Sequence, residues 1–194
     1  MEGWQIIIAV LVIAGIVGAA WFMTQRRRSE ELQGQFGPEY ERTVDQADSR
    51  RAAERELVER RKRVEGMELR PLDADQREGY LTTWRQVQAD FVDDPSGATA
   101  RADRLIEEVM AARGYPTETD FETRVADVSV NHPRVVNEYR EAREISERHA
   151  AEGLPTEALR QGFVHYRALF EDLLETGASN AEPEPEPAES TRNR

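Results

Sequence analysis

The chain has 194 residues, with 38 acidic and 26 basic side chains, 39% hydrophobic residues and no cysteine. The lack of cysteine excludes a disulfide framework, a thiol nucleophile and any Cys-ligated zinc or iron–sulfur site. The net charge of −12 argues against nucleic acid as a partner, because no net basic surface large enough to neutralise a run of phosphates is evident.

The first predicted element is a transmembrane anchor with a basic flank, over residues 1–28. Residues 4–23 are almost wholly apolar, and twenty residues span about 30 Å as a helix, which is the thickness of one bilayer core. The flank consists of Arg26, Arg27 and Arg28, which we expect to face anionic lipid. Because basic residues remain on the cytoplasmic side, we expect a single-pass protein of the plasma (inner) membrane with its N-terminus outside and its C-terminal domain in the cytoplasm.

Two alternatives concern this segment. Gly18 and Ala20 have an acceptable spacing for a cleavage site, so the run could instead be a signal peptide of an exported protein. Two pairs of small residues, Ala14 with Gly18 and Gly15 with Ala19, would allow close approach of a second helix. That pattern predicts at most a weak homo-oligomer.

A polar stalk helix is predicted over residues 29–70. Residues 24–63 carry a net charge of +2 and residues 64–194 a net charge of −13, so basic charge lies next to the predicted bilayer. Pro38 suits a first helical turn, and Glu56 with Arg60 has ion-pair spacing. The apolar positions do not keep a heptad, which favours a solvated stalk over a coiled-coil dimer.

A small antiparallel helical bundle is predicted over residues 71–177. Four amphipathic patterns come after the break at Pro71, with starts at Asp73 or Asp75, at Asp94-Pro95, at Pro133 and at Pro155. Their apolar stripes include Tyr80, Trp84, Leu105, Tyr139, Phe163, Tyr166 and Phe170. Residues 119–128 fit either a short helix or an ordered loop. Together these patterns predict an all-α fold.

A disordered Glu/Pro-rich tail is predicted over residues 178–194. Glu and Pro alternate from Glu182 to Pro187, and no apolar residue larger than alanine is present. Such a segment cannot build a core and favours an extended, self-repelling chain.

Several sequence blocks resemble those of one known group of proteins: residues 36–40 (FGPEY), 68–72 (ELRPL), 84–95 (WRQVQADFVDDP), 102–105 (ADRL), 113–116 (RGYP) and 165–170 (HYRALF). In these blocks the chain resembles a widespread bacterial family of small, single-pass membrane-anchored helical proteins, over about residues 34–174. The family has no assigned catalytic or binding residues. The resemblance therefore implies a bacterial, membrane-anchored helical module and no activity.

No catalytic, cofactor or metal constellation is predicted, and we expect no enzyme. Asp127, Ser129 and His132 are the residue types of a hydrolase triad, but they lie within one short segment and suit turn and capping roles. His132, His149 and His165 lack the paired spacing of a zinc site.

The remaining candidates are aromatic. Trp84 and Tyr166 could line a pocket or belong to the core, and Gln88, one turn after Trp84, could point a polar group into the bundle. We therefore expect a membrane-anchored interaction or scaffold module that binds another protein. The alternative is a membrane-tethered small-molecule or lipid-responsive binding domain, which would need a cavity lined by Trp84 and Tyr166.

Overall fold

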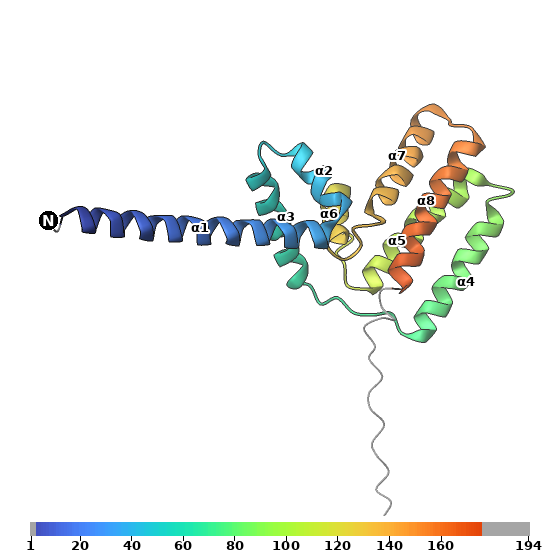
Figure 1. The fold of residues 1–194 in the computed structure, drawn as a ribbon. Helices are drawn as coiled ribbons and strands as arrows, with labels where there is room; N and C mark the ends of the chain where they lie inside the picture. The colour runs from blue at the N-terminus through green and yellow to red at the C-terminus, as the bar shows by residue number, and fades with distance from the viewer. Residues whose placement is uncertain (1–2, 176–194) are drawn as a thin grey trace, which may run out of the picture. The chain divides into compact units, whose positions relative to one another are not determined.

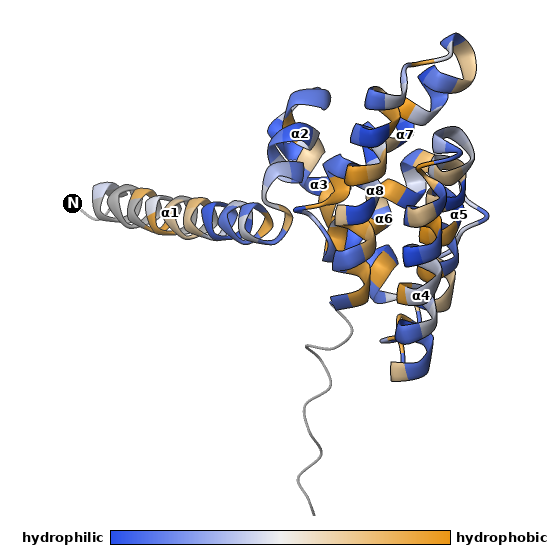
Figure 2. Cartoon of the chain, turned by 90° about the vertical axis from the view of Figure 1, so that its right-hand side faces the viewer, coloured by the Kyte–Doolittle hydropathy of each residue, from blue (hydrophilic) through white to orange (hydrophobic). Residues whose placement is uncertain are grey.

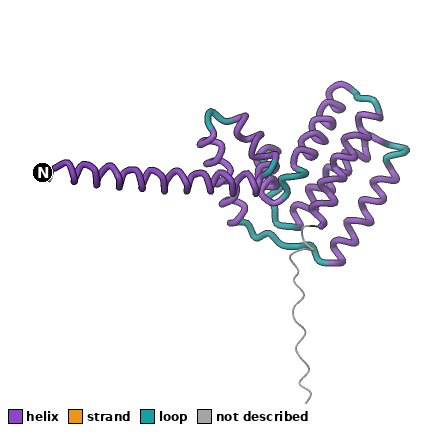
Figure 3. The backbone as a smooth tube through the Cα atoms, viewed as in Figure 1, coloured by secondary structure: helices purple, strands orange, loops and turns teal. Residues whose placement is uncertain are grey.

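The computed structural model describes residues 3–175. They contain eight helices and no strand (Figures 1 and 3), which confirms the all-α prediction. The helices are α1 (Gly3–Phe36), α2 (Pro38–Gln46), α3 (Arg50–Glu65), α4 (Ala74–Asp90), α5 (Pro95–Ala112), α6 (Phe121–Asn131), α7 (Val136–Glu152) and α8 (Thr156–Glu175).

The chain forms two compact units. The first unit comprises Met1–Gly66 and Phe121–Asn137, and the second comprises Met67–Asp120 and Glu138–Arg194. Residues 121–137, which lie inside the range predicted for the bundle, belong to the first unit.

The first unit replaces the solvated stalk that was expected over residues 29–70. The chain turns at Gly37, whose φ of 48° favours glycine, and again before Ser49, so three helical segments pack together instead of one extended helix. α6 packs against α1 and α3. The buried apolar side chains of this unit are Leu32, Phe36, Tyr40, Ala53, Leu57, Val58, Val64, Val125, Val128, Val130 and Val136.

The basic cluster of α3 is used in ion pairs within the first unit. Arg60 binds Glu39 at 2.9 Å, Arg61 binds Glu31 at 2.7 Å, and Arg63 binds Asp127 of α6 at 2.6 Å. Glu39 and Asp127 are almost fully buried. Polar residues that read as solvated in the sequence therefore hold the unit together.

The second unit contains α4, α5, α7 and α8, which are the four helices predicted from the amphipathic patterns (Figure 1). Short loops join α4 to α5 and α7 to α8, so these pairs run antiparallel. Figure 2 shows hydrophobic residues along α5 and α8, whose contact is the most extensive in the unit. Its core includes Trp84, Ala102, Leu105, Ile106, Val109, Met110, Tyr139, Leu159, Phe163, Tyr166, Leu169, Phe170 and Leu173.

Three of the four predicted helix starts agree with the structure in this unit. Asp73 is the N-cap of α4 and forms a reciprocal capping box with Gln76. Asp94 caps α5 through the amide of Gly97, with Pro95 in the first turn. Gly114 ends α5 with a φ of 93°. The third helix begins at Val136, because residues 133–135 form a turn after the proline.

No helix among the described residues is long and apolar enough to cross a membrane. The structure does not describe the side chains of much of the predicted anchor, namely those of residues 5–10, 12, 14, 17, 18 and 21. Ala14 and Gly18, one of the two predicted small-residue pairs, are among these residues. The predicted tail over residues 178–194 also lies outside the described residues.

Candidate functional site

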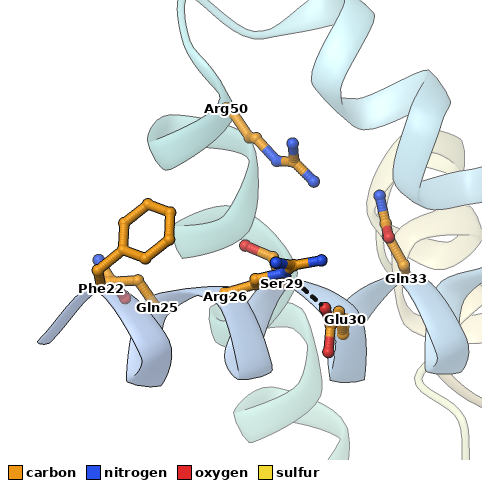
Figure 4. Close-up of a pocket in the computed structure, with 7 residues that line it drawn as sticks. All are labelled: Phe22, Gln25, Arg26, Ser29, Glu30, Gln33 and Arg50. Carbon is orange, nitrogen blue, oxygen red and sulfur yellow. Dashed lines mark hydrogen bonds and ion pairs between the residues drawn. The ribbon is translucent and has the colours of Figure 1, made fainter. Parts of the chain in front are cut away.

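The candidate site is a basic surface beside α3, on the polar part of α1 that follows its apolar residues. α1 is one continuous helix from Gly3 to Phe36, so its polar second half extends the apolar first half without a break. A hollow of about 420 Å³ lies beside it, lined by Phe22, Gln25, Arg26, Ser29, Glu30, Gln33 and Arg50. Figure 4 shows the first six of these along α1, with Arg50 facing them from α3.

A second, smaller hollow adjoins the first. It has a volume of about 150 Å³ and is lined by Gln25, Arg28, Arg51, Glu54 and Arg55. Gln25 lines both hollows. The two hollows together contain five arginines and two glutamates, so they have a net positive charge. We call the seven charged residues, Arg26, Arg28, Glu30, Arg50, Arg51, Glu54 and Arg55, the arginine belt.

Glu54, the most buried member of the arginine belt, contacts residues of all three helices around it. Its Oε1 accepts hydrogen bonds from the Ser29 hydroxyl at 2.5 Å and from the Tyr40 hydroxyl at 2.9 Å, and it lies 3.4 Å from Arg50 Nε. Burial alone would raise the pKa of Glu54, but the hydrogen bonds from Ser29 and Tyr40 and the charge of Arg50 outweigh it and hold the pKa below its usual range. The carboxylate therefore stays ionised and ties α1, α2 and α3 together.

The three arginines of the predicted basic flank have different surroundings in the structure. Arg26 lines the larger hollow and pairs with the exposed Glu30 at 3.0 Å. Arg28 lines the smaller hollow, whereas Arg27 is exposed and lines neither. Sequence reasoning missed Arg50, Arg51 and Arg55, because they join the flank only through the packing of α3 on α1. No periodic pattern in the sequence predicts that α3 packs on α1.

Trp84 and Tyr166 are buried in the core of the second unit. Trp84 stacks on Phe163 and Phe170 of α8, with ring centroids 5.0 and 4.6 Å apart. Gln88 is exposed on α4, so its amide does not point into the bundle. Trp84 and Tyr166 are both buried, and neither lines any of the three hollows described in this section.

Tyr166 has polar neighbours despite its complete burial. Its hydroxyl lies 3.1 Å from Ser146 Oγ, and its ring lies 6.3 Å from that of Tyr139. Burial is the main cause that raises the pKa of Tyr166, and the nearby charge of Asp103 adds to it. The phenol is therefore a neutral packing group.

A third hollow of about 260 Å³ lies on the second unit, and one of its lining residues is Ser146, which contacts the Tyr166 hydroxyl. It is lined by Ser96, Thr99, Ala100, Asp103, Arg104, Ser146, His149, Ala150 and Leu159. Within it, His149 Nε2 lies 3.0 Å from Ser96 Oγ, and His149 Nδ1 lies 3.2 Å from the Leu154 carbonyl oxygen. The contact with Ser96 links the start of α5 to the end of α7, and the contact with Leu154 joins α7 to the loop before α8.

The triad-like residues have separate structural roles in the first unit. Ser129 Oγ donates to the Ala126 carbonyl oxygen, and Asp127 binds Arg63. Both residues and His132 are buried. The expected turn and capping roles are not what the structure shows for Asp127 and Ser129, because both lie within α6 and Asp127 pairs with Arg63, 64 residues away in the sequence.

One cluster that the sequence did not indicate appears in the second unit. Glu138 and Glu141 of α7 lie beside His165 of α8, and their candidate ligand atoms all fall within 4.8 Å of one another. The spacing of the two glutamates, three residues apart, was the available signal, but the histidine comes from a different helix.

No family model, no curated protein and no solved structure matches this chain. Its function is therefore inferred from its own residues and geometry.

Proposed function

We propose that the protein is a single-pass, membrane-anchored helical interaction module whose first unit lies against anionic lipid headgroups. The observation that carries this proposal is a row of exposed, large apolar side chains on the same helix that continues into the arginine belt. These are Trp4, Leu11, Ile13, Ile16, Phe22 and Met23, each more than half exposed. Exposed large apolar side chains at these described positions are costly in water and suit contact with lipid.

Helix geometry supports this assignment by placing the belt at headgroup level. If the apolar run ends at Met23, a rise of about 1.5 Å per residue puts Arg26 about 4–5 Å and Ser29 about 9 Å beyond the hydrocarbon. The headgroup layer on each side of a bilayer is roughly 5–8 Å deep. The two hollows would then open among lipid phosphates.

Electrostatics support the same contact. An arginine close to an anionic leaflet contributes on the order of 1 kcal/mol to membrane association. Arginine also matches phosphate oxygens with two parallel N–H donors. Three arginines contributed by α3 would reinforce the two from α1, so the whole first unit would lie against the leaflet.

The orientation is inferred from the same charges. Arginines that flank a membrane span remain in the cytoplasm, so the proposal places both units on the cytoplasmic side of the plasma (inner) membrane. The second unit, with its buried aromatic core, would present its outer surface to a protein partner without catalysing a reaction.

The topology can be tested with single cysteines, because the chain has none of its own. Val92→Cys places a thiol at a position that is 82% exposed on the second unit, and Glu2→Cys places one before the apolar run. In intact spheroplasts a membrane-impermeant maleimide should label the Glu2→Cys protein only. After permeabilisation it should label both. Labelling of Val92→Cys in intact spheroplasts, or loss of the N-terminal segment from the mature chain, would contradict the proposal.

Lipid contact can be tested at Gln25, which lines both hollows. An environment-sensitive fluorophore on Gln25→Cys should change its emission in nanodiscs that contain phosphatidylglycerol and not in phosphatidylcholine nanodiscs. Arg26→Gln combined with Arg50→Gln should reduce the difference. Arg160→Gln, an exposed arginine of the second unit, should leave it unchanged. An identical response in both lipids would contradict headgroup binding.

A small-molecule binding domain is the second candidate, and the hollow beside His149 is the observation that favours it. Its polar lining of Ser96, Asp103 and Ser146 could orient a small polar ligand. If this candidate is right, a metabolite library should contain a compound that raises the melting temperature of the wild type but not of His149→Gln.

A further inference from the structure

The glutamate and histidine cluster of the second unit has an unusual hydrogen-bonding arrangement. Glu138 and Glu141 lie one helical turn apart on α7, and His165 projects between them from α8. The Glu138 carboxylate contacts His165 Nδ1, and Glu141 Oε2 lies 3.3 Å from His165 Nε2. Both ring nitrogens therefore face a carboxylate.

A neutral imidazole cannot satisfy both contacts. It has a single N–H, so it donates to one carboxylate and turns a lone pair toward the other. In the tautomer that carries its proton on Nδ1, this N–H donates to Glu138 and the lone pair of Nε2 faces Glu141. Nε2 and the Glu141 oxygen then face each other as two lone-pair donors, and a cation, either a proton on Nε2 or a metal ion, is needed between them.

No arginine or lysine of the described residues supplies that cation. Within that part of the chain, Glu138 and Glu141 have ion pairs with His165 alone. Elsewhere on the same two helices, carboxylates such as Glu147, Glu157 and Glu171 pair with arginines. The two glutamates with a neutral histidine therefore carry a local charge of −2.

The distance between the two facing atoms fits a metal ion. Zinc binds imidazole nitrogen and carboxylate oxygen at about 2.0–2.2 Å, so two ligands of a tetrahedral ion lie about 3.3–3.5 Å apart. The separation of Nε2 and Oε2 is 3.3 Å. A carboxylate that accepts the other N–H of a ligating histidine is also the usual arrangement around metals, and Glu138 is in that position.

We propose that His165 Nε2 and Glu141 bind a first-row divalent transition metal, with Zn²⁺ the best match, and that Glu138 positions the imidazole. Nitrogen and oxygen ligands favour such ions over Ca²⁺ and Mg²⁺, which prefer oxygen alone. The side chains of His165, Glu138 and Glu141 are 24%, 39% and 60% exposed, so water completes the coordination. The bound ion joins α7 to α8.

The test is calorimetric titration of ZnCl₂ into the full-length protein in detergent after removal of metals with EDTA. One equivalent should bind to the wild type. Glu141→Gln and His165→Gln should abolish that binding, and Glu138→Gln should weaken it about 10–100-fold, as loss of a carboxylate behind a ligand does. Absorption of bound Co²⁺ between about 500 and 650 nm should show the same order of variants. Circular dichroism in EDTA confirms that each variant is folded.

His149→Gln is the matched control, because His149 lies on α7 outside the cluster and binds Ser96 and Leu154. It should bind Zn²⁺ like the wild type. An absence of saturable Zn²⁺ binding to the wild type would overturn the proposal and leave a proton as the cation of the cluster. Equal binding by wild type and His165→Gln, or a loss in His149→Gln, would overturn it as well.

Discussion

The indole of Trp84 on α4 stacks on the ring of Phe170 on α8, with centroids 4.6 Å apart and planes inclined by 17°. The same indole contacts Phe163, two helical turns earlier on α8, at 5.0 Å and 26°. Phe163 in turn contacts Phe91 at the end of α4, with centroids 5.0 Å apart. This aromatic row joins α4 to α8, and Trp84 is its centre.

Truncation of Trp84 should therefore destabilise the second unit. Removing a buried large aromatic side chain typically costs about 3–5 kcal/mol, because the transfer energy is lost and a cavity remains. Trp84→Ala should increase amide hydrogen exchange throughout α4, α5 and α8 while α2 and α3 keep wild-type rates. Val92→Ala, at an exposed position, is the control. Unchanged exchange in α8 of Trp84→Ala would show that the indole does not support the core.

The second unit was largely predictable because the signals for its helices come from residues close together in the sequence. Asp73, Asp94 and Pro95 mark helix starts through interactions within four residues, and a 3.6-residue apolar period identifies the buried face of each helix. Trp84 and Phe163 both lie on such stripes and are buried. The exposed position of Gln88 could not be read in the same way, because its distance from the core depends on where α4 meets its neighbours.

The first unit was not predictable by the same means. Its interior contains Glu39, Glu54 and Asp127, and charged residues read as solvated unless their partners are known. Those partners are distant in sequence: Arg63 and Asp127 are 64 residues apart. The arginine belt and the Glu138, Glu141 and His165 cluster were missed for the same reason, since each combines residues from two helices.

The place of α6 in the first unit predicts how truncated chains behave. A chain of residues 24–175 keeps every buried residue of both units, which begin at Leu32, and should be soluble and unfold cooperatively. A chain of residues 67–175 removes α1 and α3, against which Val125 and Val128 are buried. Its α6 should exchange amide hydrogens at the rate of an unfolded peptide. Protected α6 amides in the shorter chain would contradict the division into units.

Gly114 predicts a backbone effect in the second unit. Its φ is 93°, and a Cβ there would lie 2.5 Å from the Glu68 carbonyl oxygen. A left-handed conformation costs an L-residue about 1–2 kcal/mol, and the close carbonyl adds to this, so Gly114→Ala should lower the urea midpoint of the second unit. Gly79→Ala, in α4 with open space around it, should instead stabilise by about 0.5–1 kcal/mol. Equal effects of the two substitutions would contradict the proposed geometry.

Arg60 and Arg61 are adjacent on α3, but their substitutions should destabilise the first unit to different extents. Arg60 binds the buried Glu39, whereas Arg61 binds the exposed Glu31. Loss of a charged hydrogen bond to a buried group costs about 1.5–3 kcal/mol, and loss of an exposed pair costs about 0–1 kcal/mol. In urea unfolding of the first unit, Arg60→Met should thus lower stability clearly more than Arg61→Met. Adding Glu39→Gln to Arg60→Met should recover part of the loss.

Glu54 predicts how the first unit responds to acid. Burial opposes ionisation of this carboxyl, but the hydrogen bonds from Ser29 and Tyr40, with the charge of Arg50, outweigh it and keep the folded pKa below the usual value. An unfolded glutamate titrates near about 4.3. The stabilisation by the ionised carboxylate is therefore fully present above that pH and is lost as the pH falls through the lower folded value.

The corresponding experiment compares the urea midpoint of the first unit at about pH 7 and about pH 3, on either side of the glutamate titration, in the wild type and in Glu54→Gln. The wild type should lose more stability between these pH values than the variant, because the substituted amide has no proton to gain. Glu59→Gln is the control on the same helix, since Glu59 is exposed and pairs with Lys62 at 3.2 Å; it should keep the wild-type pH dependence. If Glu54→Gln kept the full acid sensitivity of the wild type, the carboxylate would not be what ties α1 and α2 to α3, and the shape of the arginine belt would need a different explanation.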